Sequence, residues 1–214
     1  MQFSHNDLIN VSHMVQSTRM LGPYERSVLW VHGCCFACEG CIAKSMREGP
    51  GNPMEINAVA DVLCQSPSVE GVTLSGGEPF LQAYALSRLV DVLKARRNLG
   101  IIVYTGFTLK ELLALRRDEP SIDMLLQKTD LLIDGRYEKE LDHGEPLRGS
   151  ANQVIHLLSE RYREEYETCY LHGVRKAEIR VYSSEVQIIG VPSKDVFAAW
   201  EGFRQKARGI EYDD

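Results

Sequence analysis

The stretch Val28–Cys41, VLWVHGCCFACEGC, joins a short apolar run to a loop that is crowded with cysteines. The run is rich in β-branched residues and ends at a glycine, which predicts a buried β-strand. The cysteines of the loop are Cys34, Cys35, Cys38 and Cys41. A strand that leads directly into four closely spaced thiols predicts a functional site at the end of that strand.

Three further strand patterns follow along the chain, over residues 72–74, 101–104 and 131–133. Each of them ends in a polar or glycine-containing loop: Ser75–Pro79, Thr105-Gly106 and Asp134–Arg136. Helical patterns lie between the strands, at 55–65, 81–97, 109–117 and 122–127. This alternation predicts parallel strands with helical crossovers. Because the carboxyl ends of parallel strands meet at one edge, we expect the four loops to converge on a shared ligand.

Beyond about residue 137 the regular pattern ends. Alternating apolar residues on either side of Ser183-Ser184 predict a β-hairpin, and Ser193 is placed to cap a final helix. The apolar stripe of that helix, which includes Trp200, is most simply explained by core packing. We therefore expect a core over residues 1–160 and an extension over residues 161–214 that packs on the core and is not an independent domain.

Composition limits the class of protein. The chain has 214 residues, of which 44% are hydrophobic and 25% charged, and these are ordinary globular values. No apolar run approaches the roughly 18 residues of a membrane span, and the first ten residues lack the features of a secretory signal. The net charge of −6 disfavours general nucleic-acid binding. We expect a cytoplasmic protein that binds neither membranes nor nucleic acid.

The cysteine loop favours an iron–sulfur cluster over the alternatives. A disulfide frame is not needed in a chain of this size, and a closed zinc site would require a second ligand pair that the sequence lacks. The loop supplies three close ligands, as C-x3-C-x2-C from Cys34 or as C-x2-C-x2-C from Cys35. A cubane normally takes four cysteines, so one iron would stay open for a ligand. Cys64 and Cys169 stand alone, and we expect both to be structural.

The other loops indicate what that ligand is. The backbone at Gly76 and Gly77 can approach a ligand closely, and Glu78 can accept hydrogen bonds from an ammonium group. Asp134 suits a ribose hydroxyl or an amine, and Arg136 can hold a carboxylate with two hydrogen bonds. Each residue also has an ordinary explanation, as a turn glycine, a helix cap or an ion-pair partner. Together they describe an amino-acid–nucleoside conjugate such as S-adenosylmethionine.

The sequence resembles a known family. The spacing Cys34-x3-Cys38-x2-Cys41, followed by Ser75-Gly76-Gly77-Glu78-Pro79, is similar to that of the radical S-adenosylmethionine superfamily. Within it, the chain resembles the short activating enzymes of anaerobic ribonucleotide reductase. The similarity covers roughly residues 20–160, and it includes Tyr104-Thr105-Gly106 and Leu132–Arg136.

The resemblance implies an α/β fold, a partial (β/α)6 TIM-like barrel with a small C-terminal hairpin and helix extension. It implies a 4Fe-4S cluster, for which Cys34 is preferred to Cys35. The implied cluster ligands are Cys34, Cys38 and Cys41. The implied S-adenosylmethionine-binding residues are Gly40, Ser75, Gly76, Gly77, Glu78, Thr105, Asp134 and Arg136.

The implied activity is reductive cleavage of S-adenosylmethionine to methionine and a 5′-deoxyadenosyl radical, which removes a hydrogen atom from a backbone glycine of a partner enzyme. Such an enzyme needs a glycyl-radical partner and a one-electron donor such as flavodoxin or ferredoxin. The sequence leaves two alternatives. One is a radical enzyme that modifies a small molecule, nucleoside or peptide, and the other is a non-catalytic iron–sulfur or zinc module. Arg136 replaces the lysine of related activases, and the region after residue 160 is longer than the resemblance implies.

Overall fold

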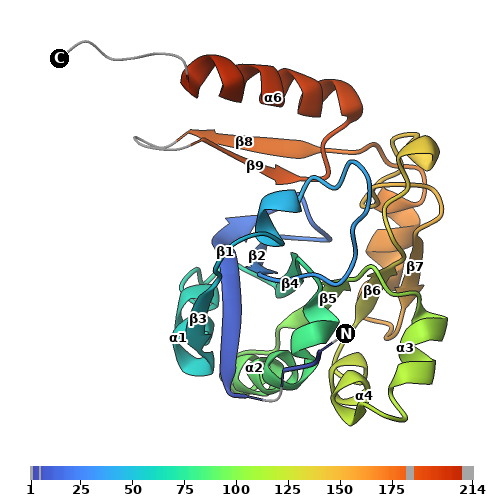
Figure 1. Ribbon diagram of the computed structural model, residues 1–214. Coiled ribbons are helices and arrows are strands. Elements are labelled where there is room, and N and C mark those ends of the chain that lie inside the picture. Colours follow the sequence, from blue (N-terminus) through green and yellow to red (C-terminus); the bar gives the residue numbers. More distant parts are fainter. Residues whose placement is uncertain (1, 5, 182–185, 209–214) are drawn as a thin grey trace.

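A computed structural model describes residues 2–4, 6–181 and 186–208 of the chain. The fold is α/β, and seven of its described strands form one large sheet in the order β3-β1-β2-β4-β5-β6-β7 (Figure 1). The strands of this sheet are β1 (Leu8–Thr18), β2 (Arg26–Val31), β3 (Asn52–Glu55), β4 (Gly71–Gly76), β5 (Gly100–Tyr104), β6 (Leu131–Asp134) and β7 (Val154–Leu157).

The centre of the sheet is the parallel set β2, β4, β5 and β6. These four strands are the ones that the sequence predicts, because both of their faces are covered and their sequences are therefore almost continuously apolar. The predicted α/β class is thus confirmed. The (β/α)6 partial barrel is not confirmed, since the sheet is open. Antiparallel β1 and β3 complete one edge and antiparallel β7 completes the other, in the places where further βα units would stand.

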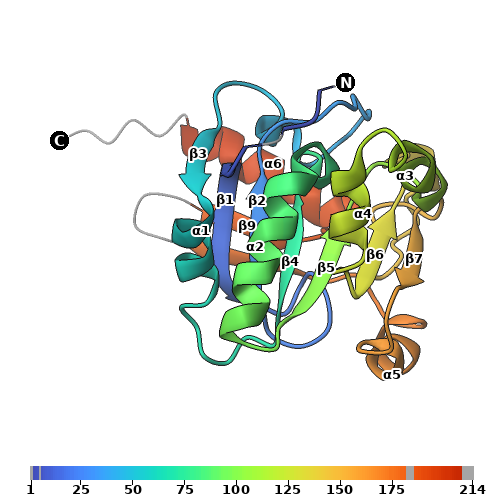
Figure 2. The same cartoon turned by 90° about the horizontal axis from the view of Figure 1, so that it is seen from below.

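Helices cover one face of the sheet (Figure 2). They are α1 (Ile56–Leu63), α2 (Ala83–Arg96) and α4 (Pro120–Leu126), and helix α3 (Leu109–Leu115) lies beside α4. The predicted capping box is present at α3, where Thr108 and Glu111 bond each other's backbone. Short helical turns complete the connections: η1 (Lys44–Met46), η2 (Pro79–Gln82) and η3 (Lys139–Leu141). Among the described residues, no helix is both long and apolar enough to cross a membrane.

The C-terminal segment covers the opposite face of the sheet. After α5 (Arg163–Glu165) and η4 (Tyr166–Tyr170), strands β8 (Ala177–Val181) and β9 (Val186–Gly190) form the predicted antiparallel hairpin. Helix α6 (Lys194–Arg208) follows, and the hairpin lies between α6 and the main sheet (Figure 1). The predicted turn residues Ser183-Ser184 lie outside the described residues.

The predicted cap of α6 is confirmed, because the Ser193 hydroxyl accepts a hydrogen bond from the Val196 amide. The prediction that the apolar stripe of α6 packs in the core is only partly right. Trp200 is buried, whereas Val196 and Phe203 are exposed. The stripe is split because α6 has only the narrow hairpin beneath it.

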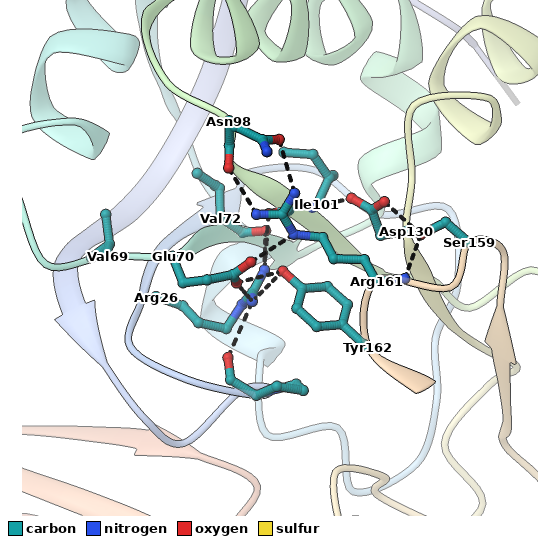
Figure 3. A network of polar contacts seen from close by, with 12 residues as sticks. Arg26, Val69, Glu70, Val72, Asn98, Ile101, Asp130, Ser159, Arg161 and Tyr162 are labelled. Carbon is teal, nitrogen blue, oxygen red and sulfur yellow. Dashed lines mark hydrogen bonds and ion pairs between the residues drawn. The ribbon is translucent and has the colours of Figure 1, made fainter. Parts of the chain in front are cut away.

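A polar network closes the amino-terminal end of the parallel strands (Figure 3). The Arg26 guanidinium is fully buried and donates to Glu70 at 3.1 Å, to the Tyr162 hydroxyl at 2.7 Å and to the Val72 and Gly100 carbonyls at 3.0 Å. The Tyr162 hydroxyl in turn donates to Glu70 at 2.7 Å. Burial of a charge requires such partners. The network joins the first parallel strand to a residue that follows the last strand of the sheet.

Candidate functional site

The loops that follow β2, β4, β5 and β6 line one cavity of about 750 Å³. This convergence is the one that the strand–loop pattern predicts. The predicted site residues that line the cavity are Cys34, Cys38, Gly40, Cys41, Ser75, Gly76, Gly77, Glu78, Thr105 and Arg136. The predicted site residue Asp134 and the fourth cysteine of the loop, Cys35, are not part of the lining.

The cysteine loop separates Cys35 from the other three cysteines. Cys35 is exposed, while Cys34, Cys38 and Cys41 are partly buried, and none of them forms a disulfide. The loop turns at Gly40, whose φ of 75° favours glycine. Burial raises the pKa of the Cys34 thiol to about 11 and also raises that of Cys41. Without a metal these thiols stay protonated, so the loop supplies its thiolates when a cation compensates the lost solvation.

The donor set fits an iron–sulfur cluster. Soft thiolates supplied by one loop are the usual ligands of such clusters. Across the described residues, no three Cys, His, Asp or Glu side chains converge closely enough to bind a single metal ion. A cluster has separate irons at its corners, so its ligands need not converge on one point as zinc ligands do.

The paired glycines Gly76 and Gly77 allow the loop after β4 to lie in close backbone contact with the start of the cysteine loop. A Cβ at Gly77 would lie 2.1 Å from the Gly33 carbonyl oxygen, and one at Gly76 would lie 2.5 Å from the backbone of Val31. Two hydrogen bonds stabilise this contact. The Gly77 amide donates to the Val31 carbonyl at 2.8 Å, and the Glu78 amide donates to the Gly33 carbonyl at 2.8 Å. The glycines are therefore required by the backbone itself, in addition to any ligand that they approach.

Glu78 connects two of the strand-end loops. Its carboxylate is fully buried and accepts hydrogen bonds from the amides of Phe80 at 2.9 Å and Gly106 at 2.8 Å, and from the Thr105 hydroxyl at 2.8 Å. Burial nevertheless raises the pKa of the Glu78 carboxyl to about 7. Removal from water disfavours the ionised carboxylate, so a cation placed beside it would offset this cost; the ammonium contact of Glu78 stays a prediction.

Asp134 and Arg136 point to different places. Asp134 shares the helix-covered face of β6 with Leu132, because successive strand residues alternate between faces. Its carboxylate accepts from the Leu109 amide at 2.5 Å and contacts His156 Nε2 at 2.9 Å. The contact with the Leu109 amide is that of a helix cap, which is one of the ordinary explanations of this residue.

Arg136 instead reaches the cavity. Its guanidinium lies 4.5 Å from the centre of the Phe36 ring and donates to Glu111 at 3.0 Å. Phe36 also meets Phe107 edge to face, with 4.8 Å between ring centres. A Cβ at Gly106 would lie 2.6 Å from Phe36, so that glycine makes room for the ring. Phe36 was not predicted, although its place inside the cysteine loop is a signal that could have identified it.

Other residues that line the cavity were also not predicted from the sequence. His13 of β1, Trp30 of β2 and Tyr104 of β5 line the cavity on the face opposite the helices. All five residues of β9 line it as well, together with Trp200 of α6. The alternation in β2 and β5 could have identified Trp30 and Tyr104. Nothing in the sequence spacing indicates where a C-terminal hairpin docks.

Comparison with known proteins identifies the family. Residues 20–156 match the family model of the 4Fe-4S single cluster domain. The chain is also similar to proteins named anaerobic ribonucleoside-triphosphate reductase-activating protein. It is 36% identical to that of Vibrio cholerae over 144 residues, which are 63% of this chain and 89% of the relative. It is 33% identical to that of Escherichia coli K12 over 150 residues, which are 64% and 91% of the two chains.

The chain belongs to this family of activating proteins. A phage T4 member is 33% identical over 140 residues, covering 63% of this chain and 85% of the relative. The predicted family, enzyme class and cofactors, a 4Fe-4S cluster and S-adenosylmethionine, are confirmed. Residues 157–214 lie outside the span of the family model. They include the hairpin and helix that cover the second face of the sheet.

Proposed function

We propose that the chain is a radical S-adenosylmethionine activase that generates a glycyl radical in an anaerobic ribonucleoside-triphosphate reductase. The observation that supports this most is the shared cavity, in which three cysteines of one loop meet the Gly-Gly-Glu turn and the Thr105-Gly106 loop. When bound there, the reduced cluster supplies the electron that cleaves S-adenosylmethionine to methionine and a 5′-deoxyadenosyl radical. That radical takes a hydrogen atom from a glycine of the partner and leaves 5′-deoxyadenosine.

In this proposal, Cys34, Cys38 and Cys41 hold the cluster, and Cys35 does not. The backbone of Ser75–Gly77 and the carboxylate of Glu78 orient the methionine amine, with Gly40 and Thr105 at the same wall. Arg136 lies over Phe36 and is only half exposed, so it is placed to hold the methionine carboxylate. Asp134 has a structural role in this proposal, since its carboxylate ties the end of β6 to the start of α3.

The remaining assignments follow from the same site. Residues 1–160 form the catalytic core, whose open sheet serves as the partial barrel, and residues 161–214 form an extension packed on it. The electron comes from an external donor such as flavodoxin or ferredoxin. All six cysteines are free thiols, which suits a reducing compartment such as the cytoplasm.

Anaerobic reconstitution tests the proposal. The protein, supplied with iron and sulfide, should bind about four irons per chain. With dithionite and S-adenosylmethionine it should release 5′-deoxyadenosine. Addition of the anaerobic ribonucleoside-triphosphate reductase from the same organism should then give the electron paramagnetic resonance signal of a glycyl radical. Iron binding without 5′-deoxyadenosine would overturn the radical activity. Release of 5′-deoxyadenosine without a glycyl radical would overturn the partner and favour another substrate.

A further inference from the structure

The turn Cys38–Cys41 carries two of the three proposed cluster ligands and receives little support from its own backbone. The Cys41 amide donates to the Cys38 carbonyl at 3.4 Å, which is long for a hydrogen bond. The two residues between these cysteines are exposed. One of them, Glu39, pairs with Lys139 at 3.6 Å, and an exposed pair of this kind contributes little. The positions of the two thiols therefore depend on side chains that pack on the turn from elsewhere.

The ring of Tyr137 packs on this turn. A Cβ at Gly40 would lie 3.2 Å from Cε1 of the ring, and a Cβ at Gly149 would lie 2.9 Å from Cδ2 on the opposite edge of the ring. The two glycines therefore leave room for the ring, which is held between the cysteine loop and the loop that follows η3. Tyr137 lines the same cavity as Cys38 and Cys41. Its ring is thus placed to fix the turn that presents both thiols.

A buried carboxylate holds the other end of Tyr137. The Tyr137 hydroxyl donates to Oδ2 of Asp142 at 3.1 Å, and Oδ1 of Asp142 pairs with the Arg175 guanidinium at 2.8 Å. The side chains of Asp142 and Arg175 are only 7% and 4% exposed. A carboxylate this deeply buried requires a cation beside it, because an unpaired charge is costly to remove from water. The position of Asp142, and with it that of Tyr137, therefore depends on Arg175.

Arg175 also fixes the loop on the other side of the Tyr137 ring. Its guanidinium donates to three carbonyls of the loop that follows η3, those of Glu145 at 3.3 Å, Arg148 at 2.8 Å and Gly149 at 2.9 Å. Gly149 is the glycine that packs on the ring. Arginine can bond in several directions at once because its planar fork carries five N–H donors. One guanidinium therefore holds both the hydroxyl partner of Tyr137 and the backbone against its ring.

Arg175 belongs to the C-terminal extension. It lies between η4 and β8, and it also donates to the carbonyl of Pro192, which lies between β9 and α6, at 3.2 Å. Both residues are outside the span of the family model, which ends at residue 156. Asp142, Tyr137 and the cysteine turn are inside that span. The contacts of Arg175 therefore join a segment that the family model does not include to the loop that carries the cluster ligands.

We propose that the C-terminal extension positions the turn Cys38–Cys41 and thereby determines how long the cluster is retained. Arg175 is the positioning residue, and it acts through Asp142 on Tyr137. Residues that stand behind the direct ligands of a metal orient those ligands and commonly change how tightly the metal is held. The inference rests on the proposed function, because that proposal assigns the thiols of this turn as cluster ligands.

Iron release tests the inference without a measurement of activity. Cluster-loaded protein is mixed anaerobically with an excess of an iron chelator, and the loss of cluster absorbance is followed with time. Arg175→Met should release iron about tenfold faster than the unmodified protein. Tyr137→Phe keeps the ring and removes only the hydrogen bond to Asp142, so it should release iron about threefold faster. This milder variant keeps the test decisive if Arg175→Met folds poorly.

Arg161→Met is the matched control. Arg161 also belongs to the extension, pairs with Glu70 at 2.6 Å and donates to the Asn98 carbonyl at 2.7 Å, but at the amino-terminal end of the parallel strands. This variant should release iron at the rate of the unmodified protein. The electron paramagnetic resonance signal of the reduced cluster should change in Arg175→Met and stay the same in Arg161→Met. Equal acceleration of iron release in both variants would show loss through general unfolding and would overturn the inference.

The double variant, Arg175→Met with Tyr137→Phe, tests whether the two residues act through the same carboxylate. Since both contact Asp142, the double variant should accelerate iron release by less than the product of the two single effects. An acceleration equal to that product, or unchanged release in Arg175→Met, would overturn the inference while the unmodified protein still carries its cluster. Failure of the unmodified protein to bind a cluster would instead overturn the proposed function.

Discussion

The two ends of the parallel strands differ in how their polar groups are satisfied. At the amino-terminal end, Arg26 is buried among Glu70, Tyr162 and two backbone carbonyls, and the network is closed by the protein (Figure 3). At the carboxyl end, Cys34, Cys38, Cys41 and Arg136 line a cavity instead. The same sheet therefore places a stabilising network at one end and groups available to ligands at the other.

The largest stability effect should come from the closed end. Arg26→Met removes a fully buried guanidinium and leaves the Val72 and Gly100 carbonyls without that donor, while Glu70 keeps its contacts with Arg161 and Tyr162. We expect the free energy of unfolding to fall by about 3–5 kcal/mol, measured by urea denaturation of the metal-free protein. Arg163→Met is the control, because that residue forms an exposed pair with Glu160 and should cost less than about 1 kcal/mol. Equal losses in the two variants would contradict the structural role of the network.

An intermediate effect should come from Glu78 and should depend on pH. Since burial raises the pKa of its carboxyl to about 7, the folded protein binds this proton more tightly than the unfolded chain does. The stabilising contribution of the proton is complete below the unfolded pKa and is lost as pH rises to about 7 and beyond. We expect the unfolding free energy of the metal-free protein to fall between pH 5 and pH 8, by roughly 2–3 kcal/mol from this group.

The comparison variant is Glu78→Gln, which cannot titrate. The unfolding free energy of this variant should depend less steeply on pH than that of the unmodified protein, even if the two proteins differ in stability at a given pH. Glu164→Gln changes an exposed carboxyl of α5 and should leave the slope as it is. If Glu78→Gln and the unmodified protein have the same slope, the carboxyl does not titrate in this range.

The smallest effect should separate Asp134 from Arg136. Asp134→Asn weakens contacts with Leu109 and His156 on the helix-covered face, so we expect a loss of about 1 kcal/mol in stability. Its affinity for S-adenosylmethionine should change little. Arg136→Ala should leave stability nearly unchanged and weaken that affinity about tenfold. Equilibrium dialysis with cluster-loaded protein measures the affinity of both variants for S-adenosylmethionine, and urea denaturation measures their stability. A tenfold loss of affinity in Asp134→Asn would show that Asp134 belongs to the ligand-binding residues.

Features of the fold and the site could be predicted where they depend on residues that are close together in the sequence. Strands β2, β4, β5 and β6 are short apolar runs, and the loops after them carry the chemistry, so a single sequence was enough to place ten of the predicted residues at one cavity. The face of Asp134 was also predictable, because it stands two residues after buried Leu132 in the same strand. The prediction gave weight to its charge and not to this alternation.

Other features depend on contacts that a sequence does not display. Arg26 and Tyr162 are 136 positions apart, and neither residue alone indicates the other. The position of His13 opposite Trp30 depends on a shift in the pairing register between β1 and β2. The hairpin was predicted from its alternation, but its position over the cavity depends on Ile189 and Arg175, whose partners lie in distant segments.

The most direct test of the account is a series of four cysteine variants, measured for iron content and for 5′-deoxyadenosine release. Cys34→Ala, Cys38→Ala and Cys41→Ala should each lose the cluster and all product, because each thiol lines the cavity. Cys35→Ala should keep both, because that thiol is exposed and lies outside the cavity lining. Loss of the cluster in Cys35→Ala together with its retention in Cys34→Ala would contradict the site described by the structure.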